Sequence, residues 1–210
     1  RLPSLTERVA VVGKERRSRR IDLMSVERTL RIIEPVRLRA KVVHGFGRGS
    51  KQLGFPTANL GIRWDVVSSL GEVKPPDLSD EEHAVLKFAT EHPTGIYCAV
   101  GVVEGMADGG VHKIAMSMGW NPTFTDLKAK TIEPWILHEF DSDFYGHYLR
   151  LLVLGYVRPE LKFESLEALK QEIVADGGFC KAALEGPDLR HLVGDTFLTT
   201  GLLGLIPSPP

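Results

Sequence analysis

A strict alternation of apolar and basic residues constrains the fold of this chain more than any other sequence feature. It runs through one stretch, Val-Arg-Leu-Arg-Ala-Lys-Val at 36–42. Successive side chains of a β-strand point to opposite faces, so the pattern predicts a strand that is buried on one face only. Further segments rich in Val, Ile, Tyr and Trp are also predicted as strands: 95–104, 111–118, 131–138 and 148–157. Short links favour antiparallel pairing in a barrel or closed sheet.

Two helices are predicted outside this series of strands. Residues 21–33 carry apolar side chains at helical spacing and are followed by Pro35, which predicts a short helix that ends there. The long passage 61–94 contains Ser79 and Glu82 in the Ser-x-x-Glu spacing of a capping box. This passage is therefore predicted to be an insertion that carries a helix.

A third helix is predicted after Ser165, which has the properties of an N-cap residue. Gly177 and Gly178 are predicted to end it, because glycine is favoured just beyond a helix C-terminus. We expect this helix to cover an open end or a seam of the barrel, and residues 186–210 to be an extended appendage. The predicted inner face of the helix consists of Leu166, Leu169, Ile173 and Val174.

The charge of the chain is unevenly distributed. Residues 1–41 carry 12 Lys and Arg against 5 Asp and Glu, whereas residues 42–210 carry 14 against 22, and the formal net charge is −1. This balance argues against a surface built as a whole for nucleic acid or an anionic membrane. The cluster at 14–20 is interpreted as a solvated arm, with a polyanion contact as the alternative. Two cysteines and no long apolar run favour a reducing, cytoplasmic location without a membrane span.

A glycine-rich segment follows the first predicted strand. Gly45, Gly47 and Gly49 alternate through it, and Lys51 comes shortly after. Glycines allow backbone N–H groups to approach an anion closely, and a lysine adds positive charge for a polyphosphate. The spacing is that of neither a Walker A loop nor a dinucleotide-binding loop. The segment therefore predicts a phosphate cradle of another kind.

Two further places carry residues suited to chemistry. Thr57 and Asn59 would point to the same side of an extended segment, where their oxygens could bind a Mg²⁺ completed by phosphates and water, although a local turn is the alternative. Glu133 lies in an apolar, strand-like run. Its carboxylate either faces a cleft, where it could accept a proton from a hydroxyl, or alternates out to solvent.

Several motifs that occur in the same order resemble those of a eukaryotic-type riboflavin kinase. The resemblance covers about residues 36–175. The motifs are Gly-Phe-Gly-Arg-Gly-Ser-Lys-Gln-Leu-Gly-Phe-Pro-Thr-Ala-Asn at 45–59, Thr-Gly-Ile-Tyr at 94–97, Ser-Met-Gly-Trp-Asn-Pro at 117–122, Ile-Glu at 132–133, Asp-Phe-Tyr-Gly at 143–146 and Arg-Pro-Glu at 158–160.

The resemblance implies a mainly β fold, namely a six-stranded antiparallel Greek-key barrel with a C-terminal helix and an inserted helix. Residues 36–180 are accordingly predicted to form the barrel domain, with an insertion at about 61–94. A basic N-terminal extension, 1–35, would precede the domain, and a C-terminal tail, 181–210, would follow it.

The resemblance also implies a reaction and roles for individual residues. The γ-phosphate of ATP would pass to the 5′-hydroxyl of riboflavin, giving FMN and ADP, with Mg²⁺ as the metal and Zn²⁺ or Mn²⁺ as alternatives. Gly45 and Lys51 would bind ATP, Thr57 and Asn59 would bind the metal with the phosphates, and Glu133 would be the base.

The resemblance implies further contacts from segments that are loops in the family. On the nucleotide side these are Ile136, His138 and Tyr145, and on the flavin side Arg158, Leu161 and Phe163.

Two features qualify the resemblance. Pro134 removes a backbone donor directly after Glu133, so the strand there is predicted to be bulged or to lie at an edge. No His-x-Gly-His motif occurs, so FAD synthesis is not expected. The alternative to a kinase is a non-catalytic barrel that binds a flavin or a nucleotide. In either case we expect a monomer whose partners include neither nucleic acid nor a membrane.

Overall fold

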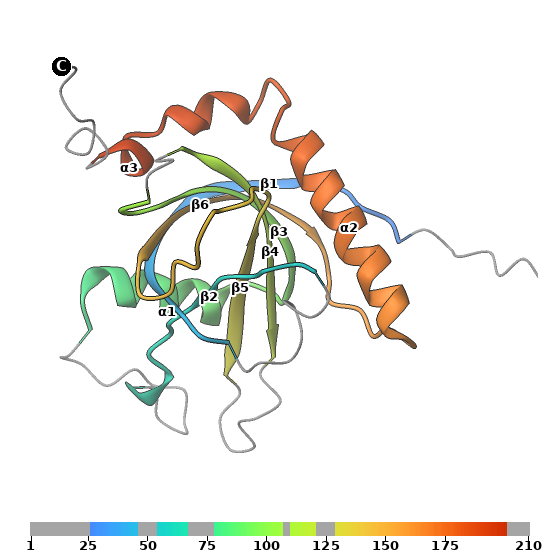
Figure 1. Cartoon of the computed structure of the whole chain (residues 1–210), viewed down its shortest axis with the longest axis horizontal. Coiled ribbons are helices and arrows are strands. Elements are labelled where there is room, and N and C mark those ends of the chain that lie inside the picture. The colour runs from blue at the N-terminus through green and yellow to red at the C-terminus, as the bar shows by residue number, and fades with distance from the viewer. Residues whose placement is uncertain (1–25, 46–53, 67–77, 107–109, 121–128, 201–210) are drawn as a thin grey trace, which may run out of the picture.

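Antiparallel strands form one strongly curved, six-stranded sheet with the order β2-β1-β6-β3-β4-β5 (Figure 1). The computed structural model describes residues 26–45, 54–66, 78–106, 110–120 and 129–200. Strands β3, β4 and β5 pair in sequence and β6 returns beside β3, which is the Greek-key arrangement that was predicted. The strands are β1 (Arg31–Val43), β2 (Asn59–Leu60), β3 (Gly95–Val103), β4 (His112–Trp120), β5 (Lys130–Ile136) and β6 (Tyr148–Arg158).

The two edges of this sheet meet, so the sheet closes into a near-barrel. The Ala58 N–H donates to the Pro134 carbonyl oxygen at 2.8 Å. The Trp64 indole N–H donates to the Lys130 carbonyl oxygen at 2.9 Å. The residue numbers rise from Ala58 to Trp64, whereas those of their partners fall from Pro134 to Lys130. This closing segment therefore runs antiparallel to β5.

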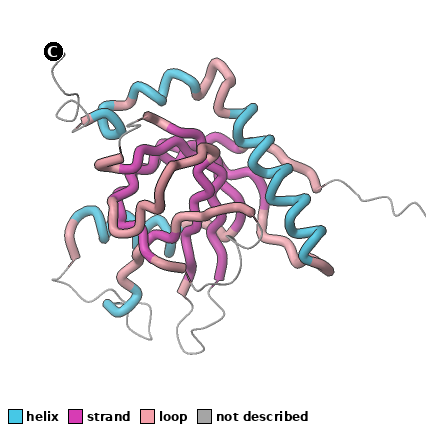
Figure 2. Tube along the Cα trace, viewed as in Figure 1, coloured by secondary structure: helices cyan, strands magenta, loops and turns pink. Residues whose placement is uncertain are grey.

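Side chains that alternate along the strands divide into an interior core and an outer core. Leu38, Ala40 and Val42 of β1 point into the barrel and are buried, as their alternation predicted. A second apolar cluster lies between the outer wall of the barrel and the segments that follow β6. Figure 2 shows the resulting arrangement, in which the helices surround the strands.

Helix α1 (Asp80–Glu91) confirms the predicted inserted helix and its start. The Ser79 hydroxyl accepts a hydrogen bond from the Glu82 N–H, and the Glu82 carboxylate accepts one from the Ser79 N–H, which completes the capping box. Phe88 on the buried side of α1 belongs to the same core as the barrel interior, so the helix is anchored on the barrel. A short 3-10 helix, η1 (Trp64–Val66), precedes α1.

The helix predicted over 21–33 is wrong for the part of it that the structure describes. Residues 26–30 have no regular structure, and β1 begins at Arg31. An irregularity in the pairing of β1 with β6 lies between Ile32 and Val36 and contains Pro35. Pairing with β6 therefore outweighs the local helical spacing of the apolar residues.

Helix α2 (Leu166–Ala183) begins at the predicted N-cap, Ser165, but does not end at Gly177. It continues through both glycines, and it packs on the outer wall formed by β3 and β4 rather than on an end or a seam of the barrel. Its predicted inner face is also wrong in part, since Leu166 and Val174 are 66% and 55% exposed. The buried positions of α2 are Asp176, Gly177 and Cys180.

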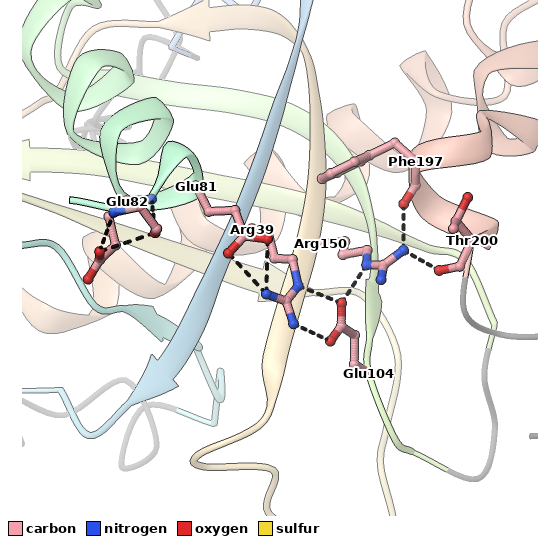
Figure 3. Close-up of polar contacts among 8 residues, drawn as sticks. Arg39, Glu81, Glu82, Glu104, Arg150, Phe197 and Thr200 are labelled. Carbon is pink, nitrogen blue, oxygen red and sulfur yellow. Dashed lines mark hydrogen bonds and ion pairs between the residues drawn. The ribbon is translucent and has the colours of Figure 1, made fainter. Parts of the chain in front are cut away.

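The segment after α2 is folded as far as the structure describes it, rather than an extended appendage. It contains η2 (Arg190–Gly194) and α3 (Thr196–Thr199). Leu198 is fully buried, and the Arg150 guanidinium donates to the carbonyl oxygens of Phe197 and Thr200 (Figure 3). Glu104 accepts hydrogen bonds from both Arg150 and Arg39, so this network fixes the segment to the barrel. None of the helices in the described ranges is long and apolar enough to cross a membrane.

Candidate functional site

The residues predicted to bind the metal and to act as base meet where the barrel closes. Ala58 is buried in the barrel interior, so its neighbours Thr57 and Asn59 project to the other side of the segment. The antiparallel hydrogen bond between Ala58 and Pro134 places Asn59 next to Glu133. The shared orientation expected of Thr57 and Asn59 is therefore confirmed, whereas their binding of a metal stays a prediction.

Gly45 packs directly against the Asn59 side chain. A Cβ atom on Gly45 would lie only 2.4 Å from Asn59 Nδ2, so no residue larger than glycine fits without moving that amide. Immediately before it, the His44 ring stacks on the Tyr145 ring with 3.8 Å between centroids. Gly45 and Tyr145 are thus brought to the same place as Asn59. Lys51 lies outside the described residues.

Glu133 is half-buried on the outer wall of the barrel. Ile132 and Ile136 on either side of it face the interior, so Glu133 and Trp135 face outward. Its cross-strand partner on β4 is Ser117, which shares this face. Among the described residues, no hydrogen bond or ion pair engages the Glu133 carboxylate. This outward, half-buried position fits both alternatives open from the sequence, so the role of Glu133 as a base stays a prediction.

Pro134 is accommodated because β5 is an edge strand of the sheet, one of the two possibilities predicted. The register of β5 with β4 is continuous, so the strand has no bulge at this position. The Pro134 carbonyl points at Ala58, and in an antiparallel strand the N–H of a residue points to the same side as its carbonyl. The donor that proline lacks therefore faces the seam, and no bond to β4 is lost.

Ile136 is the last residue of β5, and His138 follows the strand. The Ile136 side chain is buried in the barrel interior, so a nucleotide could contact only its backbone. The His138 ring is exposed and stacks on the His112 ring with 4.0 Å between centroids. Their contact with ATP stays a prediction.

The Arg158 side chain points to α2 in this structure, and its contact with the flavin stays a prediction. Its side chain is buried, and it donates two hydrogen bonds to the Asp176 carboxylate of α2, at 2.9 and 2.5 Å. Asp176 also accepts from Arg28 at 2.9 Å. The physical reason is that a buried guanidinium requires a carboxylate partner, and α2 supplies one. Leu161 and Phe163 are only partly covered, and their flavin contact stays a prediction.

Two residues near Glu133 were missed by the sequence interpretation. The Trp135 ring makes an edge contact with Phe55, with 5.0 Å between centroids. The Glu160 carboxylate lies over β4, where one of its oxygens is 2.5 Å from the position that a Cβ atom of Gly119 would take. The alternation along β5 could have identified Trp135 as a neighbour of Glu133, whereas nothing local in the sequence places Glu160 over β4.

Comparison with known proteins identifies related sequences and related structures. The family model described as "Flavokinase: Riboflavin kinase" matches residues 32–184. A bifunctional riboflavin kinase/FMN phosphatase from Arabidopsis thaliana is 44% identical over 174 residues, which are 83% of this chain but 39% of that protein. The riboflavin kinase of Homo sapiens is 41% identical over 163 residues, covering 78% of this chain and 90% of the relative.

The fold is also shared with a solved structure. The crystal structure of riboflavin kinase from Trypanosoma brucei matches with a TM-score of 0.55 and 28% sequence identity. The match covers 85% of this chain and 94% of that one. The six-stranded near-barrel with its helices is therefore the fold of that enzyme.

Proposed function

The chain belongs to the riboflavin kinase family, and on this premise we propose that it transfers the γ-phosphate of ATP to the 5′-hydroxyl of riboflavin, giving FMN and ADP. The observation that carries the proposal is the meeting of Gly45, Asn59 and Glu133 at the seam of the barrel. Gly45 and Asn59 come from the two ends of the motif at 45–59, and Glu133 comes from a separate motif. The match with this chain covers only 39% of the Arabidopsis relative, so it gives no ground for assigning the phosphatase activity of that protein to this chain.

The side chains at the seam suit a metal held jointly with phosphates. Thr57 and Asn59 offer a hydroxyl and an amide oxygen on one side of the segment, which are donors that a hard cation accepts. Mg²⁺ is commonly bound by few protein oxygens and completed by phosphate oxygens and water. Bound there, it would neutralise negative charge on the transferring phosphoryl group. Gly45 keeps the backbone close enough for the phosphates to reach Asn59.

Glu133 is proposed as the general base. Phosphoryl transfer asks the protein mainly to position the reactants, with a carboxylate that accepts the proton of the attacking hydroxyl. Glu133 lies beside Asn59 on an outward face. A hydroxyl bound against β5 would therefore lie between the Glu133 carboxylate and the phosphates bound near Asn59. On the nucleotide side we propose contacts from Lys51 and Tyr145, and on the flavin side from Leu161 and Phe163.

The proposal is tested by incubating the purified protein with riboflavin and ATP, with and without Mg²⁺, and separating the flavins by chromatography. We expect FMN to form only when a divalent metal is present. Glu133→Gln should lower kcat by roughly 100-fold or more, the scale of a general-base contribution. The exposed Glu91 of α1 offers a matched control, since Glu91→Gln removes the same charge from a residue to which no role in the reaction is assigned.

The outcomes separate the two classes of function. Absence of FMN from the wild-type reaction, together with bound riboflavin or ADP, would favour the non-catalytic barrel instead. An unchanged kcat in Glu133→Gln would remove Glu133 from the mechanism while leaving the kinase assignment intact. Thr57→Ala should raise the Mg²⁺ concentration needed for half-maximal rate, and an unaltered Mg²⁺ dependence would exclude Thr57 as a ligand.

A further inference from the structure

The outer wall formed by β4 and β5 changes character along its length. At one end Ala115 and Trp135 pack in the outer core beneath α2. Further along, the same face carries two cross-strand pairs, Ser117 with Glu133 and Gly119 with Thr131. Outward positions beyond the α2 contact are thus a carboxylate, two hydroxyls and a glycine. We call Ser117, Gly119, Thr131 and Glu133 the polar strip.

Glu160 lies over the far end of the polar strip. Gly119 has no side chain, and the space that its Cβ would occupy is taken by the Glu160 carboxylate, with Oε1 at 2.5 Å, Cδ at 3.3 Å and Oε2 at 3.9 Å from that position. Gly119 belongs to the outward row of β4, because Met116 and Met118 face the interior. Glu160 and Glu133 therefore face the same strip from two different segments of the chain.

The Glu160 carboxylate also lies near the ammonium group of Lys130. Burial lowers the pKa of Lys130, and the nearby Glu160 carboxylate partly offsets this by stabilising the ammonium. A charged carboxylate forms stronger hydrogen bonds with hydroxyl donors than a neutral group does. Among the described residues, no hydrogen bond engages this carboxylate.

From this geometry we propose that Glu160 binds the inner hydroxyl groups of the ribityl chain of riboflavin and so selects a polyol-bearing flavin. The inference rests on the proposed kinase function, in which Glu133 faces the terminal hydroxyl. Gly119 is two residues beyond Ser117 along β4, a separation of about 7 Å along the strand. An extended five-carbon chain that starts at Glu133 spans a comparable length, so its inner hydroxyls reach Glu160.

The first test compares the steady-state constants of the wild type, Glu160→Gln and Gly119→Ala. Loss of a hydrogen bond to a charged group should raise the KM for riboflavin about tenfold in Glu160→Gln, with the KM for ATP unchanged. Gly119→Ala should also raise the KM for riboflavin, because its methyl group would displace the Glu160 carboxylate without removing its charge. Glu167→Gln, an exposed carboxylate in the first turn of α2, is the matched control.

The second test separates binding of the ribityl chain from general damage to the site. Binding of riboflavin and of lumiflavin, which has the ring but no ribityl chain, is measured by quenching of flavin fluorescence. Glu160→Gln should weaken riboflavin binding and leave lumiflavin binding unchanged, whereas a merely structural role would weaken both. An equal effect on both flavins, or an unchanged KM for riboflavin, would overturn the inference. A wild type that forms no FMN would instead refute the proposed function.

Discussion

Two adjacent glycines in α2 allow the packing of this helix on the barrel to be tested with a matched pair of variants. A Cβ on Gly177 would lie 2.3, 2.9 and 3.2 Å from three atoms of the Trp135 ring, whereas a Cβ on Gly178 would meet nothing within 4 Å. Both residues are inside the helix. The two Gly→Ala variants therefore differ in one respect, the contact with Trp135.

The expected free energies follow from these distances. Alanine is favoured over glycine in a helix, so Gly178→Ala should raise the free energy of unfolding by about 0.5–1 kcal/mol. Gly177→Ala gains the same helix contribution but overpacks against a rigid indole ring, which costs about 1–3 kcal/mol. The helix contribution cancels in the comparison. Gly177→Ala should consequently be less stable than Gly178→Ala by about 1–3 kcal/mol.

Urea unfolding followed by tryptophan fluorescence and by circular dichroism measures both variants against the wild type. Equal stability of the two variants would refute the reasoning, because it would mean that α2 does not press Gly177 onto Trp135. A destabilised Gly178→Ala would refute it too, since that result would place the end of the helix at the glycines, as the sequence alone predicts.

Three further predictions test other parts of the structure. Asp176→Ala should lower the free energy of unfolding by about 3–5 kcal/mol, because it leaves the buried Arg158 without its carboxylate. The control Glu185→Ala removes an exposed partner of Lys113 and should change the free energy of unfolding little. Equal losses of stability in urea unfolding would contradict the role given to the buried ion pair. Hydrogen bonds from Arg39 hold the pKa of Glu104 below its ordinary value of 4.5. A carboxyl group with a depressed folded-state pKa stabilises the fold above its unfolded-state pKa, and this stability is lost as the pH falls through the folded-state value. The unfolding midpoint of Glu104→Gln should therefore fall less steeply with decreasing pH than that of the wild type. The same dependence of the midpoint on pH in both proteins would exclude Glu104 as a contributor. Gly45→Ala should raise the KM for Mg-ATP more than the KM for riboflavin, because its Cβ would displace the Asn59 amide 2.4 Å away, and an unchanged KM for Mg-ATP would remove Gly45 from the nucleotide site.

The parts of the fold that the sequence predicted correctly are those where one local pattern has one physical solution. Alternation in 36–42 admits only a strand with one buried face, and the barrel interior buries Leu38 and Ala40 accordingly. The capping box of α1 depends on residues three apart, Ser79 and Glu82, so it needs no tertiary information. The close spacing of Thr57 and Asn59 fixed their shared side for the same reason.

The incorrect predictions concern segments whose structure is decided by distant partners. Residues 21–33 carry apolar side chains at helical spacing, yet pairing with β6 makes 31–33 part of a strand. Gly177 has the local properties of a helix end, yet it continues the helix because only glycine allows α2 to approach Trp135 so closely. In both cases the partner lies far away in the sequence, so no window of neighbouring residues contains the information.

The Arg-Pro-Glu motif at 158–160 shows the same limit within the candidate site. The sequence singled out Arg158 as the ligand residue, whereas its guanidinium points into α2 and pairs with Asp176. Glu160, two residues on, points to Gly119 and the polar strip. The two charged residues of this motif therefore point to different parts of the structure. Since Arg158 fixes the end of β6 against α2, it also fixes where Glu160 emerges over β4, and a buried ion pair becomes part of how the proposed site is positioned.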